Sequence, residues 1–503
     1  MTASLPHSLY RSDQVRDGER KIASDLGEKM YDLMTHAGFA VFNVLCQRWP
    51  EADKILICCG CGNNGGDGYV VGRLALEAGL NVTLWSACDP LKITGDALLA
   101  QQAFVKQGGT ILTGDLPDEP RDLIIDALFG TGLSRDVSGC YRDAITSINA
   151  SSSPVLAVDI PSGLHADTGG VLGGAVSADI TVTFVALKQG LFTGKAVDHC
   201  GELIFDGLDI GQAFEAHIPS SVTLLCSEQA RQLEPTRCQS AHKGHFGRLL
   251  CIGGEKGTGG AIILCGQAAL RTGAGLVALL TDETNVTAIL ARQPELMTRQ
   301  WEEKRGSKAL NEILAWADVI ALGPGLGQSA WSKRVFDAAL ESCKPMVIDA
   351  DGLTLLSRDP CRNQRQNQQN NWILTPHPGE AATLLNLSVE EIERDRFSAV
   401  KEIHNRYGGV VVLKGAGTIV YDGVHSFVIH AGNPGMASGG MGDVLTGVIA
   451  SCLAQSQSLE DAARFGAFLH SYAADIAAQP GSRGLLASDL LPLLGNNIEQ
   501  MQI

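Results

Sequence analysis

The chain has 503 residues, of which 45% are apolar and 19% are charged, a composition typical of a folded globular protein and not of a disordered chain. Its length is sufficient for two or more domains, each with a core of its own. The net charge of −16 argues against a nucleic-acid surface, which needs a basic patch, and no apolar run approaches the ~20 residues of a membrane span.

The fourteen cysteines show neither the spacing of a metal site nor a disulfide framework. Free thiols in this number are typical of a reducing compartment, and the N-terminus from Met1 to Tyr10 lacks the apolar core of a signal peptide. We therefore expect a cytoplasmic protein. Cys58, Cys59 and Cys61 lie on or beside a predicted strand, where we expect small buried apolar side chains.

The first half of the chain alternates helical and strand-like patterns. It opens with a polar helix predicted over 13–24 and an amphipathic helix over 28–48. Short apolar runs separated by helical patterns then predict a parallel sheet covered on both faces. The predicted strands are Ile55–Cys59, Asn81–Trp85, Leu123–Asp126, Val155–Asp159, Ile180–Phe184 and Glu202–Phe205.

Three polar, glycine-rich loops follow strands of this predicted sheet. The run Gly60–Gly68 lies between the first strand and a helix predicted over Tyr69–Ala78. Such a turn presents unpaired backbone N–H groups to an anion with no Cβ in the way, so a phosphate-bearing ligand is the first hypothesis. The other two loops, Asp126–Leu133 and Asp159–Gly163, each begin with an acid. Open parallel sheets bind ligands at the carboxyl ends of their strands, so the three loops could share one site.

These loops carry the side chains for binding a cation and for moving a proton. Asn64, Asp126 and Ser162 could supply oxygens to one monovalent or divalent cation. Asp159 would then remain free as a base or as an anchor for a hydroxyl group. Lys188 could neutralise a phosphate, and it could equally be a snorkelling surface lysine.

The runs 62–68, 126–132 and 159–163 resemble the three signatures of the NAD(P)H-hydrate epimerase domain. The resemblance implies a Rossmann-like αβα sandwich in residues 1–220 that interconverts the R and S forms of hydrated NADH or NADPH. It implies that Asn64, Asp126 and Ser162 bind potassium and that Asp159 is catalytic. The hydrated nucleotide would be bound by Asn63, Asn64, Gly65, Gly66, Asp67, Gly130, Thr131, Gly132, Leu133, Ser134, Arg135, Asp136 and Asp159.

Residues 210–233, with scattered proline, serine and other polar residues, are predicted to be a linker. A second α/β alternation follows it, and the polar run 362–371 is predicted to be a solvated or mobile surface insertion without chemistry. The predicted strands of this half are Arg248–Ile252, Gly275–Leu280, Val319–Leu322, Met346–Asp349, Trp372–Thr375, Val410–Leu413 and Thr418–Tyr421.

The run Gly439–Asp443 leads into a helix predicted over Val444–Ala450. Glycines followed by an aspartate at a helix entry offer amides to a moving phosphoryl group and a carboxylate to a hydroxyl proton, the two groups that phosphoryl transfer needs. A helix capped by an aspartate is the alternative interpretation. The nearby run Leu413–Thr418, which could present Lys414 and backbone amides to a nucleotide, favours phosphoryl transfer.

The second half resembles the ribokinase-like superfamily and, within it, the ADP-dependent NAD(P)H-hydrate dehydratases, through the runs 242–244, 323–327, 377–380, 414–418 and 439–443. The resemblance implies a ribokinase-like αβα domain in residues 221–503 that uses Mg²⁺ with ADP. Ala261, Gly325, His377 and Asp443 would face the hydrated nucleotide, with Asp443 as the base that activates its hydroxyl for phosphorylation. ADP would be bound by Lys414, Gly415, Ala416, Gly417, Thr418, Asn433, Gly439, Gly440 and Gly442.

Together, the two resemblances imply a bifunctional metabolite-repair enzyme whose partners are hydrated NADH or NADPH and ADP. The epimerase would supply the S form, which the dehydratase returns to NADH or NADPH. The alternative is a small-molecule kinase of the hydroxyethylthiazole or pyridoxal type, preceded by a non-catalytic binding or scaffold module. The sequence leaves open the choice between ADP and ATP, the choice between NADH and NADPH hydrates, and whether the protein is a homo-oligomer.

Overall fold

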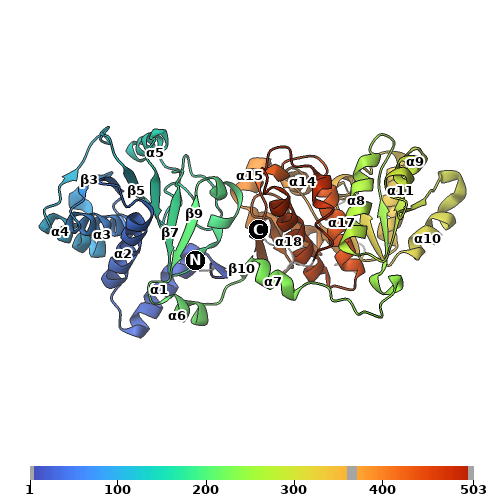
Figure 1. Cartoon of the computed structure of the whole chain (residues 1–503), viewed down its shortest axis with the longest axis horizontal. Helices are drawn as coiled ribbons and strands as arrows, with labels where there is room; N and C mark the ends of the chain where they lie inside the picture. Colours follow the sequence, from blue (N-terminus) through green and yellow to red (C-terminus); the bar gives the residue numbers. More distant parts are fainter. Residues whose placement is uncertain (1–4, 359–370, 497–503) are drawn as a thin grey trace. The chain divides into compact units, whose positions relative to one another are not determined.

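The structure, a computed structural model, describes residues 5–358 and 371–496. The chain divides into two compact units, Met1–Thr223 (unit 1) and Leu224–Ile503 (unit 2), and each unit is built on a mainly parallel sheet with helices packed on it (Figure 1). The α/β fold predicted for both halves is confirmed. The polar run 362–370 lies outside the described residues.

The sheet of unit 1 has the strand order β4-β3-β2-β5-β6-β7-β9, and every neighbouring pair is parallel. The six predicted strands are present with ends shifted by no more than one residue, and β4 is an additional edge strand. The strands are β2 Lys54–Cys59, β3 Asn81–Ser86, β4 Ile111–Leu112, β5 Leu123–Ala127, β6 Val155–Val158, β7 Ile180–Phe184 and β9 Glu202–Asp206.

Helices cover both faces of this sheet because alternate side chains of a buried strand point to opposite faces. In β2, Ile55 and Ile57 belong to a core shared with α2, α3 and α4, whereas Leu56 and Cys58 belong to a second core shared with α5 (Figure 1). The helices are α1 Ser12–Leu26, α2 Met30–Arg48, α3 Asn63–Glu77, α4 Gly95–Lys106, α5 Cys140–Ala150 and α6 Gly211–His217.

Helix α3 begins at Asn63, so the prediction of a loop up to Gly68 and a helix from Tyr69 is wrong. The glycines of this run allow close packing of the first helical turns. A Cβ on Gly65 would lie 2.1 Å from the carbonyl oxygen of Gly60, and a Cβ on Gly66 would lie 2.6 Å from Cε of Met34. The glycine-rich sequence therefore brings the N-terminus of α3 directly against the end of β2.

Two of the cysteines correct the expectation of free thiols. Cys61 and Cys88 form a disulfide with a Cα–Cα distance of 6.0 Å, and Cys61 is exposed rather than buried. Strands β2 and β3 are adjacent and parallel, with Cys59 opposite Ser86, so the residues two positions further along each strand lie side by side. The pairing follows from this register, which cysteine spacing alone does not reveal. Cys58 and Cys59 are buried, as predicted.

The predicted linker 210–233 contains the division between the two units, after Thr223, but most of it is regular structure and not an irregular connection. It contains α6, strand β10 Val222–Leu225 and helix α7 Ser227–Gln232. Within unit 1, the short strand β1 Ser8–Tyr10 pairs antiparallel with the start of β10 and parallel with β8 Leu187–Lys188. Scattered polar residues interrupt the spacing of apolar residues in this segment, so the pattern did not indicate these short elements.

Unit 2 is built on the strand order β13-β12-β11-β14-β15-β16-β17-β18-β19, parallel as far as β17 and antiparallel from there. All seven predicted strands are present, and β13 and β19 are additional. The strands are β11 Arg248–Ile252, β12 Leu276–Leu280, β13 Met297–Arg299, β14 Val319–Leu322, β15 Met346–Ile348, β16 Trp372–Leu374, β17 Val410–Leu413, β18 Ile419–Tyr421 and β19 Ser426–Ile429.

One face of this sheet packs on α8, α17 and α18, whose apolar side chains share a core with Leu249 and Cys251 of β11. The intervening Leu250 and Ile252 are fully buried on the other face. The remaining helices are α8 Gly259–Thr272, α9 Val286–Arg292, α10 Gly306–Trp316, α11 Ala330–Glu341, α12 Ala350–Ser357, α14 Pro378–Leu385, α15 Val389–Arg394, α16 Arg396–Tyr407, α17 Met441–Ala454, α18 Leu459–Ala477 and α19 Ala487–Leu490.

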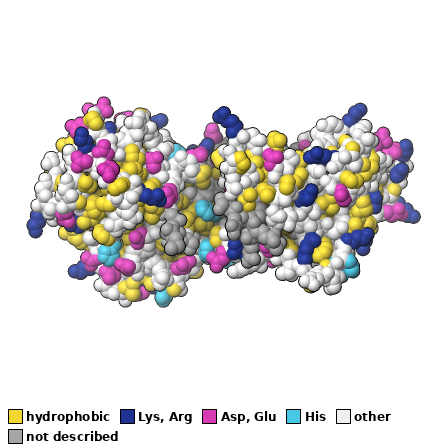
Figure 2. Space-filling model, in the orientation of Figure 1, with side chains coloured by type: hydrophobic (Ala, Val, Ile, Leu, Met, Phe, Trp, Pro, Cys, Tyr) yellow, Lys and Arg dark blue, Asp and Glu magenta, His cyan; other side chains and the backbone are white. Residues whose placement is uncertain are grey.

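Surface charge is mixed on the face drawn in Figure 2, where Lys and Arg side chains of the described residues are interspersed with Asp and Glu. Among the described residues, no helix combines the length and the apolar character needed to cross a bilayer.

The packing of α3 predicts that Gly65→Ala destabilises unit 1. A methyl group placed 2.1 Å from a backbone oxygen forces the helix away from β2, and we expect a loss of about 3 kcal/mol in the free energy of unfolding. Gly62→Ala is the matched control, because a Cβ there meets nothing within 4 Å and the residue has φ −93°, which every residue type tolerates. Hydrogen exchange of the β2 amides measures the change, and equal protection in the two variants would contradict the prediction.

Candidate functional site

Unit 1 contains a cavity of about 500 Å³ at the carboxyl ends of its central strands. The loops that follow β2, β5 and β6 all line it, which confirms that the three glycine-rich loops share one site. Ten of the residues predicted to bind the nucleotide line this cavity: Asn63, Asn64, Asp67, Gly130, Thr131, Gly132, Leu133, Ser134, Arg135 and Asp159.

Three predicted binding residues do not line the cavity. Gly65 and Gly66 are buried in the first turns of α3, where they allow the close packing on Gly60 and Met34. The Asp136 side chain lies beside Gly173. The structure therefore gives Gly65 and Gly66 a packing role.

Asp159 and Lys188 form an ion pair at the edge of the cavity, with 2.5 Å between Nζ and Oδ1. Lys188 is buried, and its ammonium group also donates to Oγ1 of Thr183 and to the carbonyl oxygen of Phe184. Lys188 is thus not a surface lysine, and Asp159 is not free. Asp159 has φ 67°, a left-handed conformation that the surrounding structure must hold in place.

The three predicted cation ligands lie together beside the cavity. Asp126 is fully buried at the end of β5, where its carboxylate accepts hydrogen bonds from the backbone N–H and the hydroxyl of Ser162 at 2.8 and 2.6 Å. The Ser162 hydroxyl also accepts from Phe129 N–H, and the Asn64 side chain lies against Gly130 in the same loop. Burial raises the pKa of Asp126 to about 6, although its hydrogen bonds act in the opposite direction.

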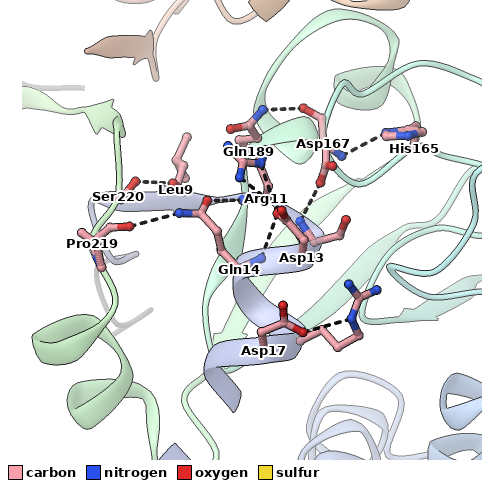
Figure 3. Close-up of polar contacts among 12 residues, drawn as sticks. Leu9, Arg11, Asp13, Gln14, Asp17, His165, Asp167, Gln189, Pro219 and Ser220 are labelled. Atoms are coloured by element: carbon pink, nitrogen blue, oxygen red, sulfur yellow. Dashed lines mark hydrogen bonds and ion pairs between the residues drawn. The ribbon is translucent and has the colours of Figure 1, made fainter. Parts of the chain in front are cut away.

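Helix α1 contributes a wall of the cavity that the sequence did not indicate. Its residues Val15, Arg16, Glu19 and Arg20 line the cavity. The helix is held by the loop that follows β6, because Ser12 N–H donates to the Asp167 carboxylate at 2.6 Å (Figure 3). Gln189, next to Lys188, donates to the Asp167 carbonyl oxygen at 2.8 Å. The helix and the Asp159–Lys188 pair are thus linked through Asp167.

Two carboxyl groups on the cavity wall have raised pKa values. Burial raises the pKa of Glu19 to about 7, with Lys188 acting against it and Asp159 adding to it. Burial also raises the pKa of Asp67 well above its usual range, with further contributions from Asp159 and Glu19. With a pKa of about 7, Glu19 can donate a proton near neutral pH.

In unit 2, a second buried Asp–Lys pair lies at the carboxyl ends of the strands. Asp349 follows β15 and accepts from Lys414 Nζ and Thr446 Oγ1, each at 2.7 Å. Lys414 also lies 3.5 Å from the Glu380 carboxylate. Burial acts to lower the pKa of Lys414, but the negative charges of Asp349 and Glu380 outweigh the effect of burial, so the pKa is raised. The sequence analysis predicts that Lys414 binds a nucleotide, but it gives no role to Asp349, the ion-pair partner of Lys414.

Asp443 lies in the first turn of α17, beside this pair. A Cβ on its neighbour Gly442 would lie 3.3 Å from Lys414 Nζ and 3.5 Å from Asp349 Oδ2. Burial and the negative charge of Asp349 raise the pKa of Asp443 to about 7, with Lys414 acting against them. A carboxyl group with this pKa can accept a proton at neutral pH.

The residues predicted to face the substrate in unit 2 lie at the same edge of the sheet. The Thr258 hydroxyl donates to the Gly325 carbonyl oxygen at 2.7 Å, and Ala261 N–H donates to Thr258 O at 3.3 Å. His377 begins α14 and lies 3.5 Å from Glu380, which in turn contacts Lys414.

The predicted ADP-binding residues form two loops of unit 2. In the first, Gly415 has φ 135° and packs against the guanidinium group of Arg396, which donates to the carbonyl oxygens of Leu413 and Lys414. Ala416, Gly417 and Thr418 complete this loop, and the Thr418 hydroxyl donates to Gly415 O.

In the second loop, Asn433 donates to the Asp475 carboxylate at 2.9 Å and accepts from Gly435 N–H. Gly440 is the N-cap of α17 with φ 93°, and a Cβ on Gly439 would meet nothing within 4 Å. Arg396 and Asp475 thus hold the two loops, and the sequence had not singled out either of them.

Comparison with known proteins places both units in known families. A family model described as NAD(P)H-hydrate dehydratase matches residues 249–495, and one described as YjeF-related protein N-terminus matches residues 30–190. A solved ribokinase-like superfamily protein from Enterococcus faecalis is 28% identical, covers 56% of this chain and 96% of its own, and has a TM-score of 0.50.

Two curated relatives match along almost the whole chain, and both are named bifunctional NAD(P)H-hydrate repair enzymes. The Coxiella burnetii protein is 45% identical over 489 residues, which are 97% of this chain and 98% of the relative. The Escherichia coli protein is 46% identical over 494 residues, which are 98% of this chain and 94% of the relative. These matches do not favour the small-molecule kinase. The chain therefore belongs to the family of bifunctional NAD(P)H-hydrate repair enzymes.

Proposed function

We propose that unit 1 epimerises the R and S forms of hydrated NADH or NADPH and that unit 2 dehydrates the S form with ADP as phosphoryl donor. One observation carries the assignment of both sites. In each unit, a carboxyl group with a pKa of about 7 lies close to a buried Asp–Lys ion pair at the carboxyl end of the sheet. Both reactions act on the ring hydroxyl of the hydrate, and both need a group that exchanges protons at neutral pH.

In unit 1, the proposal assigns the hydrated ring to the cavity beside Asp159. Epimerisation at C6 can proceed by departure and return of the hydroxyl or by opening of the ring, and we assign the first route, in which the carboxylate of Asp159 accepts or returns a proton. Lys188 holds that carboxylate in position, because its ammonium group donates to Oδ1 at 2.5 Å. The N–H groups of the first turn of α3, whose residues Asn63 and Asn64 line the cavity, suit the phosphates of the nucleotide.

The residues Asn64, Asp126 and Ser162 fit a potassium ion. They offer a carboxylate, a hydroxyl and an amide, which are oxygen ligands of the kind that hard cations take. The amide nitrogen of Asn64 is buried and finds no hydrogen-bond partner among the described residues. Turning the amide over would place its oxygen there instead, at a position that a cation satisfies. Bound potassium would offset phosphate charge and fix the loop after β5.

In unit 2, the proposal assigns ADP, with Mg²⁺ on its phosphates, to the loops that contain Lys414–Thr418 and Asn433–Gly442. Asp443 takes the proton of the substrate hydroxyl as its oxygen attacks the terminal phosphorus. The N–H groups at the start of α17 stabilise the charge that develops on the phosphoryl group. Departure of the phosphate from C6, with loss of a proton from the neighbouring C5, then restores the double bond of the nicotinamide ring.

A coupled assay tests both assignments. The protein is mixed with both hydrate epimers, potassium, Mg²⁺ and ADP, or ATP in a parallel reaction, and the absorbance of the reduced nicotinamide is followed. We expect complete recovery with the unmodified protein. Asp159→Asn should recover the S half at the original rate and the R half at least about 100-fold more slowly, because only epimerisation needs that carboxylate. Equal recovery of both halves would contradict the role of Asp159.

A double variant controls for folding in this assay. Asp159→Asn leaves the ammonium group of Lys188 buried and unpaired, at a cost of about 3–5 kcal/mol. Asp159→Asn/Lys188→Met removes both charges, so it should be more stable than the single variant and equally slow in epimerisation. Hydrogen exchange of the β7 amides reports the stability of unit 1 alone.

The pKa of Asp443 predicts the pH dependence of dehydration. The base must be ionised, so kcat/KM should rise with pH and level off above a pH of about 7. Asp349→Asn removes a negative charge that raises the pKa of Asp443, so this rise should move to lower pH by about one unit. Asp461→Asn, on the exposed start of α18, is the control and should leave the profile unchanged. Asp443→Asn should abolish dehydration and retain binding of ADP.

Potassium binding predicts a specific stabilisation of unit 1. If the site is half-saturated at about 10 mM, replacing choline chloride by KCl at about 100 mM stabilises the folded state by about 1.4 kcal/mol. Asp126→Asn removes the only formal charge among the three ligands, and we expect it to abolish the difference between the two salts. Thermal unfolding measures the effect, and an equal response to potassium in both proteins would exclude the site.

A further inference from the structure

Glu19, on the wall of the unit 1 cavity, has no step of its own in the chemistry proposed above. Glu19 is half-buried on α1 and lines the cavity together with Asp159 and Lys188. It lies four residues after Val15, so the two side chains are stacked on the face of α1 that meets the cavity. A carboxylate on the exposed surface would be solvated, whereas this one faces the space assigned to the substrate.

The charged side chains around Glu19 do not form an ion pair with it. Lys188 is committed to Asp159, Thr183 and Phe184. Arg16 pairs with the exposed Asp17, and Arg20 acts on Glu19 only at longer range. No hydrogen bond or ion pair from the described residues engages the Glu19 carboxyl group. Besides Glu19, the acids that line the cavity are Asp67, Asp96 and Asp159, and Asp67 and Asp159 interact electrostatically with Glu19. A half-buried carboxyl group without a partner costs the fold stability, and a ligand in the cavity could use it.

The position of α1 is defined by the same loops that hold Asp159. Asp167, which follows β6, accepts from Ser12 at the start of α1, and Gln189, which follows Lys188, donates to Asp167 (Figure 3). Glu19 and Asp159 are therefore held relative to one another, although 140 positions separate them in the chain. They reach the cavity from different elements, a helix and a strand end.

We propose that Glu19 is a second catalytic residue of the epimerase, which exchanges a proton with the C6 hydroxyl on one face of the hydrated ring while Asp159 does so on the other. This inference rests on the proposed function of unit 1. An epimerase must treat both epimers as substrates, so a single acid–base group on one face would serve only one of them well. Two groups on opposite faces satisfy this requirement.

The steps balance as follows for one direction. Protonated Glu19 gives its proton to the C6 hydroxyl, the C6–O bond breaks and water leaves, while the N1 lone pair forms the N1=C6 bond of an iminium ion. Water then adds to C6 from the opposite face and gives a proton to the Asp159 carboxylate. One proton has moved from Glu19 to Asp159, and solvent restores the starting state. The opposite epimer runs the same steps in reverse.

Both directions therefore need a form of the enzyme in which one of the two carboxyl groups, Glu19 or Asp159, is protonated and the other is ionised. Burial raises the pKa of Glu19 to about 7, opposed by Lys188 and Arg20 and assisted by Asp159, so Glu19 holds that proton below this pH. Above it, the proton is lost and epimerisation should slow in both directions. Burial also raises the pKa of the neighbouring Asp67 well above its usual range.

The test measures epimerisation of each purified hydrate by chromatography, in the full-length protein, from acid to alkaline pH. We expect Glu19→Gln to lower kcat at least about 100-fold with little change in KM, and to remove the decline above a pH of about 7. Glu19→Asp should recover part of the rate and restore a decline with pH. Asp25→Asn, on the exposed end of α1, is the matched control and should behave as the unmodified protein.

Three outcomes would overturn the proposal. The first is Glu19→Gln epimerising at a rate within about threefold of the original with the same pH profile. The second is a loss of rate in Glu19→Gln that leaves the decline above a pH of about 7 in place, since a merely structural role would act in this way. The third is epimerisation in ¹⁸O-labelled water without uptake of the label, because the hydroxyl must leave and be replaced. Failure of the proposed function is distinguished from these, because the unmodified protein would then epimerise neither hydrate.

Discussion

In each unit, a buried lysine neutralises an aspartate at the carboxyl end of a parallel strand. Asp159 is paired with Lys188, and Asp349 with Lys414. Removing two charges from water is expensive, and the pair persists only because each charge compensates the other and the remaining donors and acceptors are hydrogen-bonded. The rest of each site depends on this compensation of charge. A third ionisable group nearby lies in a region that has almost no net charge and little contact with water.

That third group is Glu19 in unit 1 and Asp443 in unit 2. In both cases burial is the first cause of the raised pKa, and the paired aspartate and lysine then act in opposite directions. The two sites belong to different sheets and contain no common sequence motif. Both sites place a carboxyl group beside an Asp–Lys ion pair. A carboxyl group exchanges a proton near neutral pH when it is shielded from water and its charge is not fully compensated by a cation.

The sequence was sufficient to predict the parallel strands and the loops that line the cavity, because apolar runs and glycine-rich turns are local signals. It was insufficient where a property depends on contacts between distant segments. Glu19 lies in a polar helix whose pattern gives no reason to single it out, and only the packing of α1 beside the β6 loop brings it to the cavity. Lys188 was ambiguous for the same reason, because burial decides its role. The start of α3 was misplaced because glycines disfavour helices in isolation, whereas here they allow the close packing that stabilises one.

The Cys61–Cys88 disulfide lies between the ends of two adjacent strands, and Cys61 is itself on the cavity wall. A covalent bond of this kind depends on the redox conditions of the solution and not only on the fold. Samples prepared with and without a thiol reductant therefore differ in covalent structure at the wall of the unit 1 cavity. Enzymologists comparing such samples would be comparing two chemical species, which intact-mass measurement after alkylation distinguishes.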